Sequence, residues 1–259
     1  MLVKVFSKQI NISMLENKLP RGFNHRRMKL INRVFKTDVT PLRKVPQIGL
    51  EQSATIEMYA DDQFVYKVFL GSRQHEQFEL FLKNYQGSMQ ILDVYRQGTS
   101  TNFLKLSIFK INKIPGMTLT NIGEEKLSFE MSLPKAVTWF RDQIIEIHNT
   151  GIRCNERYEQ FKVGNDPWDH GFVFTFSDWH GQNILFDSKT KKLHLVDFEP
   201  IDWIPVNTWQ LLIKDQLRSF LNGFPDEWKR HHKLYRHDIV RKITQELQDD
   251  LNQLIKYVF

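Results

Sequence analysis

The sequence predicts an α+β protein with two lobes, a small β-rich N-terminal lobe and a mostly helical C-terminal lobe. Strand-like alternation with one helical segment comes first along the chain, and mostly helical spacing follows it. The 259 residues, 41% of them hydrophobic and 25% charged, suffice for a substantial core. We divide the chain into a basic N-terminal extension over 1–48, an N-terminal lobe over 49–114 and a C-terminal lobe over 115–259.

The N-terminal lobe is predicted from short apolar runs that are separated by turns. Strands are expected over 54–60, 63–70, 89–96 and 103–111. A tight turn is expected at 60–62. A helix is expected over 71–85, where Ser72 suits the N-cap and apolar residues recur at helical spacing. A short basic helix over 23–36 precedes the lobe, and Pro41 is expected to break the pattern that follows it.

The C-terminal lobe is predicted to be built mainly from helices. Pro134 opens a helix with an apolar stripe, and Gly151 is expected to end it. Residues 152–171 show no clear period. Short strands are then expected over 172–176, 184–186 and 193–196. The last helix carries a long apolar stripe between Ile239 and Val258, which indicates that it packs against the core.

The composition excludes several classes of protein. A single cysteine, Cys154, rules out a disulfide scaffold and a cysteine-rich zinc site, and it fits a reducing compartment. The sequence has no transmembrane segment, and polar residues interrupt the apolar run at the N-terminus, which makes it a poor signal peptide. We therefore expect a cytoplasmic protein, with peripheral contact at a membrane surface as an open alternative.

Positive charge is concentrated at the N-terminus. Residues 1–48 hold eleven lysines and arginines against two acidic residues, whereas the whole chain has a net charge of +6. Such a segment could contact a polyanion, either a nucleic acid, lipid head groups or an acidic glycan. The alternative is a solvated helix face without a partner.

One predicted hairpin places three polar side chains near one another. Asp178 precedes its first strand, Asn183 begins that strand, and Asp197 ends the second. A carboxylate and an amide at adjacent strand ends can hold a divalent cation through oxygen ligands. Asp178 beside them could accept a proton from an attacking hydroxyl group. Alternatively, Asp178 and Asn183 are turn and cap residues that flank a buried strand.

This pattern resembles the catalytic-loop and metal-loop pair of the protein-kinase-like fold, in which Asp-x-x-x-x-Asn is followed by Asp-Phe. His180 makes the segment more similar to the aminoglycoside and choline phosphotransferases, which commonly read His-Gly-Asp-x-His-x-x-Asn. Phe176 and Ser177 depart from that pattern. We expect His180 to be a structural histidine that bonds the loop backbone rather than a metal ligand.

The resemblance covers about residues 50–215 and implies roles for further residues in chain order. Lys67 resembles the phosphate-binding lysine, and Glu76 would be its ion-pair partner, with Glu79 as the alternative. The segment 108–116 resembles the hinge between the lobes. The backbone of Asn112, Lys113 and Ile114 in this segment would bind adenine. Ser53, before the first strand, would contact the phosphates.

The resemblance implies an ATP- and Mg²⁺-dependent phosphotransferase. Asn183 and Asp197 would bind Mg²⁺, and Asp178 would orient and deprotonate the acceptor hydroxyl. The phosphate loop has only Gly49, and Glu199 stands where protein kinases have a glycine. These departures favour a small molecule, sugar or glycan as the acceptor. Two alternatives stay open, a Ser/Thr protein kinase and a pseudokinase or polyanion-binding scaffold.

Overall fold

The computed structural model describes residues 25–44, 55–70, 74–87, 91–97, 106–123, 131–158, 172–176, 178–196 and 201–257. The N-terminal part contains α2 (His25–Phe35), β1 (Thr40–Lys44), β2 (Thr55–Ala60), β3 (Phe64–Leu70), α3 (Gln74–Asn84), β4 (Ile91–Gln97) and β5 (Leu106–Asn112). The C-terminal part contains β6 (Met117–Thr118), α5 (Leu133–Tyr158), β7 (Phe172–Phe176), β8 (Ile184–Asp187), β9 (Lys192–Leu195), β10 (Ile201–Pro205), α6 (Val206–Asn222), α7 (Asp226–His231) and α8 (His237–Tyr257).

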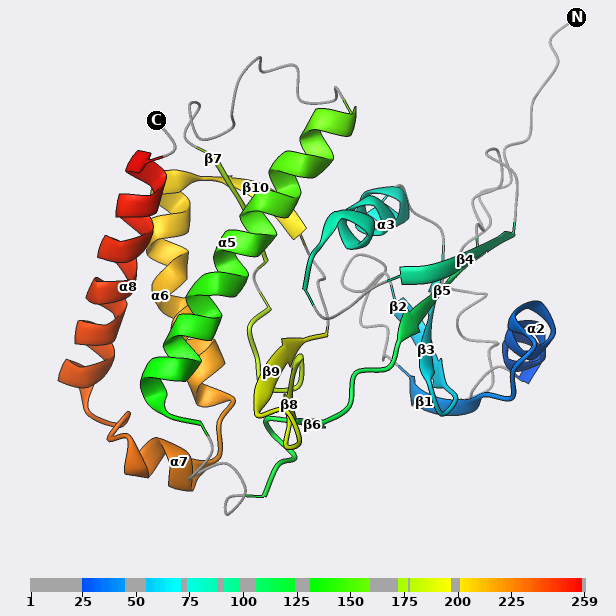
Figure 1. Ribbon diagram of the computed structural model, residues 1–259, viewed down its shortest axis with the longest axis horizontal. Coiled ribbons are helices and arrows are strands. Elements are labelled where there is room, and N and C mark those ends of the chain that lie inside the picture. Colours follow the sequence, from blue (N-terminus) through cyan, green and yellow to red (C-terminus); the bar gives the residue numbers. More distant parts are fainter. Residues whose placement is uncertain are drawn as a thin grey trace, which may run out of the picture.

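The predicted α+β, two-lobed organisation is confirmed. Figure 1 shows the N-terminal sheet with α2 and α3 beside it, and the long helices α5, α6 and α8 on the other side of the molecule. The hairpin of β8 and β9 lies between these two parts. This architecture places Lys67 of the N-terminal sheet opposite the hairpin of β8 and β9, which is the arrangement that the sequence predicts for the site.

The N-terminal sheet is antiparallel and has the order β1-β2-β3-β5-β4. Strand β3 is paired on both sides, and Lys67 lies between Met58 of β2 and Phe109 of β5. Side chains alternate across a strand. Tyr66 accordingly packs in the cluster that includes α2, whereas Phe69 belongs to the larger cluster shared with the C-terminal lobe. Lys67 lies on the same face as Phe69, toward that lobe.

Residues 25–44 pack on this sheet. Ile31 of α2 is fully buried against it, and Arg27 forms a buried ion pair of 3.1 Å with Glu57 of β2. Strand β1 was not predicted, because Pro41 was expected to break the pattern. Pro41 is accommodated because β1 is the edge strand and its register shifts next to this residue. At such a position the sheet does not need the backbone N–H that proline lacks.

The predicted turn between β2 and β3 is confirmed, and Asp61 organises it. Its carboxylate accepts hydrogen bonds from the N–H groups of Gln63 at 2.8 Å and Phe64 at 2.6 Å. It also accepts from the hydroxyls of Thr37 at 2.6 Å and Tyr66 at 2.8 Å. Burial alone would raise the pKa of Asp61, but these hydrogen bonds to the charged form outweigh it and lower the pKa to about 2.

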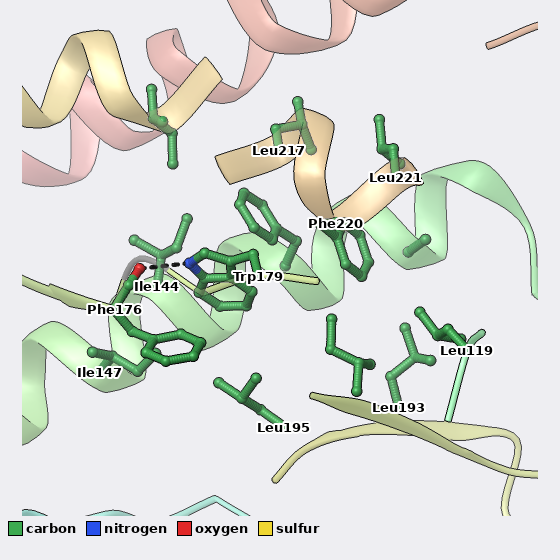
Figure 2. Close-up of a cluster of buried hydrophobic side chains, with 14 of the residues drawn as sticks. Leu119, Ile144, Ile147, Phe176, Trp179, Leu193, Leu195, Leu217, Phe220 and Leu221 are labelled. Atoms are coloured by element: carbon green, nitrogen blue, oxygen red, sulfur yellow. Dashed lines mark hydrogen bonds between the residues drawn. The ribbon is translucent and has the colours of Figure 1, made fainter. Parts of the chain in front are cut away.

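The C-terminal core is centred on Trp179. Figure 2 shows its indole surrounded by apolar side chains from α5, α6 and the hairpin of β8 and β9. The indole Nε1–H donates a 2.7 Å hydrogen bond to the carbonyl of Phe176, as the dashed line in Figure 2 marks. Trp179 therefore buries a large apolar ring while its one hydrogen-bond donor has a partner. Both effects stabilise the segment that follows strand β7.

Helix α5 is longer than predicted. Gly151 was expected to end it, but the helix continues to Tyr158, and residues 152–158 are therefore helical rather than irregular. A Cβ at position 151 would lie 2.3 Å from the ring of Phe174 in β7. The glycine therefore serves the close approach of the helix to the strand, and this packing outweighs its low helix propensity. The short strands β6 and β10, which pair with β8 and β7, were also missed.

His148 of α5 is buried at this same contact with β7. The residue is only 3% exposed, and the Nδ1 of its ring accepts a 3.2 Å hydrogen bond from the N–H of Phe174. Burial lowers the pKa of His148 from 6.5 to about 3, because the imidazolium would lose its hydration. The neutral imidazole is therefore the form that the folded protein accepts.

We expect acid to destabilise the fold through His148. As the pH falls from 6.5 toward 3, only the unfolded chain takes up this proton, so the free energy of unfolding drops by about 1.4 kcal/mol per pH unit. His148→Asn keeps an acceptor for the Phe174 N–H but does not titrate. Thermal melts between pH 7 and pH 4 should show a shallower loss for His148→Asn than for the wild type. Parallel curves would contradict this role.

Candidate functional site

The loop between β7 and β8 is fixed to the core at several points. Trp179 anchors it, and the N–H of Asn183 donates a 2.9 Å hydrogen bond to the carbonyl of His180, which closes a tight turn. The side-chain amide of Gln216 in α6 donates a 3.0 Å bond to the carbonyl of Phe176. The loop therefore holds Asp178 between two fixed points, the end of β7 and the start of β8.

A contact between two glycines also positions this loop. A Cβ added to Gly181 would lie 2.7 Å from Cα of Gly223, and one added to Gly223 would lie 2.6 Å from Cα of Gly181. Gly223 caps the end of α6 in an ordinary helical conformation, with φ of −66°. Its role is therefore close packing of backbone on backbone. Gly223 could not be recognised from the sequence, because no local pattern links it to a loop so distant along the chain.

Asp178 and Asn183 are brought together as predicted. Nδ2 of Asn183 donates to Oδ2 of Asp178 at 3.0 Å and to the backbone carbonyl of Asp178 at 3.1 Å. Both partners are acceptors, so the amide group that faces them is the NH₂. The Oδ1 of Asn183 is thereby directed away from Asp178. The pair leaves an amide oxygen as a candidate metal ligand beside a half-exposed carboxylate.

The hairpin that follows brings the start of β8 next to the end of β9. Ile184 pairs with Leu195, and the N–H of Val196 donates a 2.9 Å hydrogen bond to the carbonyl of Asn183. Asp187 organises the turn between the strands by accepting bonds from Lys189 N and Thr190 Oγ1 at 2.9 and 2.7 Å. Asp197 is the residue after Val196 and lies outside the described residues.

Lys67 connects the N-terminal sheet with this hairpin. The residue is only 3% exposed, and its Nζ donates a 3.4 Å hydrogen bond to the carbonyl of Val196. Lys67 and Val196 are far apart in the sequence and lie in different lobes. The structure thus joins Lys67, Val196, Asn183 and Asp178 through successive hydrogen bonds. Val196, which the ammonium group contacts, precedes the predicted metal ligand Asp197 in the sequence.

The acidic residues of α3 differ in what the structure describes. Glu79 is buried and forms ion pairs with Lys83 of its own helix, at 2.5 Å, and with Arg96 of β4. These contacts tie α3 to the sheet. Glu76 lies in the first turn of α3, and its side chain is outside the described residues. The choice of Glu76 as the partner of Lys67 stays a prediction.

The predicted hinge follows β5, and one of its backbone groups has a structural role. The N–H of Lys113 donates a 2.9 Å bond to the carbonyl of Gln63, and its Nζ donates a 2.9 Å bond to the carbonyl of Asp61. Lys113 thereby supports the turn between β2 and β3. Asn112 is the last residue of β5 and pairs with Phe64. An adenine ring would have to use other groups, such as the N–H of Ile114.

The predicted phosphate-binding and metal-binding residues are described only in part. Ser53 lies outside the described residues, as does Asp197. Within the described ranges, His, Cys, Asp and Glu form no cluster of three or more that could hold a metal ion. The oxygen of Asn183 suits Mg²⁺, which takes oxygen ligands and usually needs only one or two from the protein. The one described ligand, the amide oxygen of Asn183, is therefore of the kind that this ion binds.

Comparisons with known proteins give similarities to solved structures but not to sequences. No protein-family model matches the sequence, and no curated protein matches it. The chain is similar to the solved structure of the kinase PK-1 from the Cydia pomonella granulovirus, with 12% identity and a TM-score of 0.37. That match covers 76% of this chain and 74% of the viral chain. The two-lobed organisation rests on the strand order of the N-terminal sheet and on the contact between Lys67 and Val196.

Proposed function

We propose that the protein is an ATP- and Mg²⁺-dependent phosphotransferase that moves the γ-phosphoryl group of ATP to a hydroxyl group of a small molecule, sugar or glycan. One observation supports this proposal above the others, the continuous series of hydrogen bonds from Lys67 through Val196 and Asn183 to Asp178. A buried ammonium, an amide oxygen and a half-exposed carboxylate are thereby gathered across the two lobes. Phosphoryl transfer needs these groups for charge neutralisation, metal binding and proton acceptance.

Each side chain has a role in the proposed reaction. Lys67 binds the α- and β-phosphates, and Asn183 with Asp197 holds Mg²⁺, which would neutralise charge on the phosphates when bound. Asp178 orients the acceptor hydroxyl and takes its proton. The bond from the acceptor oxygen to the γ-phosphorus forms while the bond to the bridging oxygen breaks. ADP leaves with that electron pair.

The acceptor class is proposed from the sequence around the site. The stretch 200–206 is too short for a regulated activation loop, and Glu199 replaces the glycine of protein kinases. Both features favour a small-molecule or glycan acceptor. A Ser/Thr protein kinase is the alternative. Incubation with γ-labelled ATP, a generic protein substrate and a panel of sugars and amino alcohols separates the two by which component gains the label.

Binding of ATP with Mg²⁺ tests the proposed nucleotide site directly. We expect ATP–Mg²⁺ to raise the melting temperature of the wild type, as any ligand of the folded state does. Lys67→Met should abolish this shift, because it removes the ammonium that contacts the phosphates. The matched control is Lys214→Met, at an exposed position on α6. A wild-type protein that does not respond to ATP–Mg²⁺ would favour the scaffold alternative.

The exposed face of α2 favours polyanion binding as a second candidate function. Arg26, Lys29, Arg33 and Lys36 are exposed and recur every three or four residues, so they lie along one side of the helix. The apolar side of α2 is packed on the sheet through Ile31, so it is not available for insertion into a lipid bilayer. We therefore propose a phosphate-rich polymer, a nucleic acid, as the partner of this face.

Titration with labelled single-stranded DNA tests this second candidate. Binding should weaken steeply with added salt, because phosphate contacts release counterions. Replacing Arg26, Lys29 and Arg33 by glutamate should abolish it and leave the melting temperature within about 2 °C, since the side chains are exposed. Binding to anionic phospholipid vesicles in place of DNA would instead indicate a membrane surface.

No described helix combines the length and hydrophobicity needed to cross a bilayer.

A further inference from the structure

His180 lies between the backbone of its own loop and the carboxylate of Asp178. Its Nδ1 is 3.2 Å from the N of Gln182, and its Nε2 is 3.2 Å from Oδ1 of Asp178. The side chains of His180 and Asp178 are 41% and 42% exposed. Apolar packing therefore does not fix the direction of the carboxylate, and its hydrogen bonds must do so.

The two contacts determine which ring nitrogen carries the proton. A backbone N–H can only donate, so the N–H of Gln182 requires a bare lone pair on Nδ1 of His180. A neutral imidazole with a bare Nδ1 carries its proton on Nε2. That Nε2–H then donates to Oδ1 of Asp178. The turn of the loop thus selects the tautomer that can hold the carboxylate.

Asp178 is held from both sides as a result. His180 donates to Oδ1, and Asn183 donates to Oδ2 at 3.0 Å. Two donors on different oxygens fix the plane of a carboxylate, and each oxygen keeps a further lone pair that can receive a proton. We propose that His180 is a positioning residue that aligns Asp178 with the acceptor hydroxyl. This inference rests on the proposed phosphotransferase function.

Two substitutions separate positioning from a merely structural role. The side-chain amide of His180→Gln reaches the place of Nε2 and can donate to Asp178, but it cannot accept from Gln182 as Nδ1 does. The shorter side chain of His180→Asn can accept from Gln182 but cannot reach Asp178. Positioning predicts that glutamine preserves turnover and asparagine does not. A structural role in the turn predicts the reverse order.

The measurement is phosphate release from ATP–Mg²⁺ with water as the acceptor. We expect kcat of His180→Asn to be lower by about 10- to 100-fold, because a small misplacement of a reacting group is costly. The KM for ATP should not change. His180→Gln should retain most of the turnover. Asparagine activity equal to that of the wild type, or higher than that of glutamine, would overturn the positioning role.

Nitrogen-15 spectra of the histidine rings provide a readout that does not depend on turnover. The ring signals of His180, assigned with His180→Asn, should show the Nε2–H tautomer in the wild type. Protonation on Nδ1 in an active enzyme would overturn this inference alone. A wild type that shows the expected tautomer but transfers phosphate neither to water nor to any acceptor of the panel would refute the phosphotransferase proposal, and the positioning role would fall with it.

Discussion

Asp178→Asn is expected to lower kcat by about 10²- to 10⁴-fold, the contribution typical of a general base. The amide has nearly the shape of the carboxylate but cannot take the proton of the acceptor hydroxyl. Asn183 and His180 would still surround it, so the loop should keep its conformation. The KM for ATP should change little, because the proposed partner of Asp178 is the acceptor rather than the nucleotide. Steady-state kinetics with the acceptor found in the panel provide the measurement.

The control for this substitution is Asp215→Asn on α6. Asp215 is also an aspartate paired with a basic residue, at 3.6 Å from Arg218, but its side chain is 72% exposed and that partner belongs to the same helix rather than to the loop. It should have wild-type kinetics. Full activity of a folded Asp178→Asn protein would refute the assignment of Asp178, and loss of circular dichroism would show that the residue is structural instead.

Gly223→Ala is expected to disturb the same loop from behind. The new methyl group would lie 2.6 Å from Cα and 2.7 Å from N of Gly181, and backbone atoms cannot rotate away as a side chain can. Overpacking of this kind costs about 1–3 kcal/mol of folding free energy. Displacement of the loop by about 1 Å should also lower kcat by about 100-fold, because Asp178 moves with it.

Alanine is compatible with the backbone at this position, which makes the test specific. Gly223 has a helical φ of −66°, so the substitution introduces a steric contact and no conformational strain. Gly123→Ala is the matched control, because a Cβ there would meet no atom within 4 Å. Melting temperature and kcat should both fall for Gly223→Ala and stay unchanged for Gly123→Ala. Equal behaviour of the two variants would exclude a positioning role for the glycine contact.

Local patterns predicted most elements but not the exceptions that tertiary contacts impose. Alternation and helical spacing located β2, β3 and the hairpin of β8 and β9 within a few residues. Strand β1 was missed because Pro41 is usually a strand breaker, and only an edge position makes it acceptable. Gly151 was assigned as a helix end because its packing partner, Phe174, cannot be identified from spacing alone.

The candidate site was predictable to the extent that its residues share one segment. Asp178 and Asn183 are five positions apart, and the loop that contains them brings them into contact. The contact between Lys67 and Val196 could be predicted only through a family resemblance, because it joins the two lobes. The adenine contact of the Lys113 backbone stays a prediction. Nothing in the sequence indicates that its N–H completes a turn by donating to Gln63, because that bond joins residues far apart in the chain.

The shared apolar cluster has a consequence for how the chain can be divided. It includes Phe81 of α3 and Phe109 of β5 together with Ile144 of α5, so one continuous core extends through both lobes. A fragment that starts after residue 114 would expose to water the apolar surface that these aromatic rings cover in the intact chain. Such a truncation should aggregate instead of yielding a tractable domain, and the melting of the intact chain should follow a single cooperative transition.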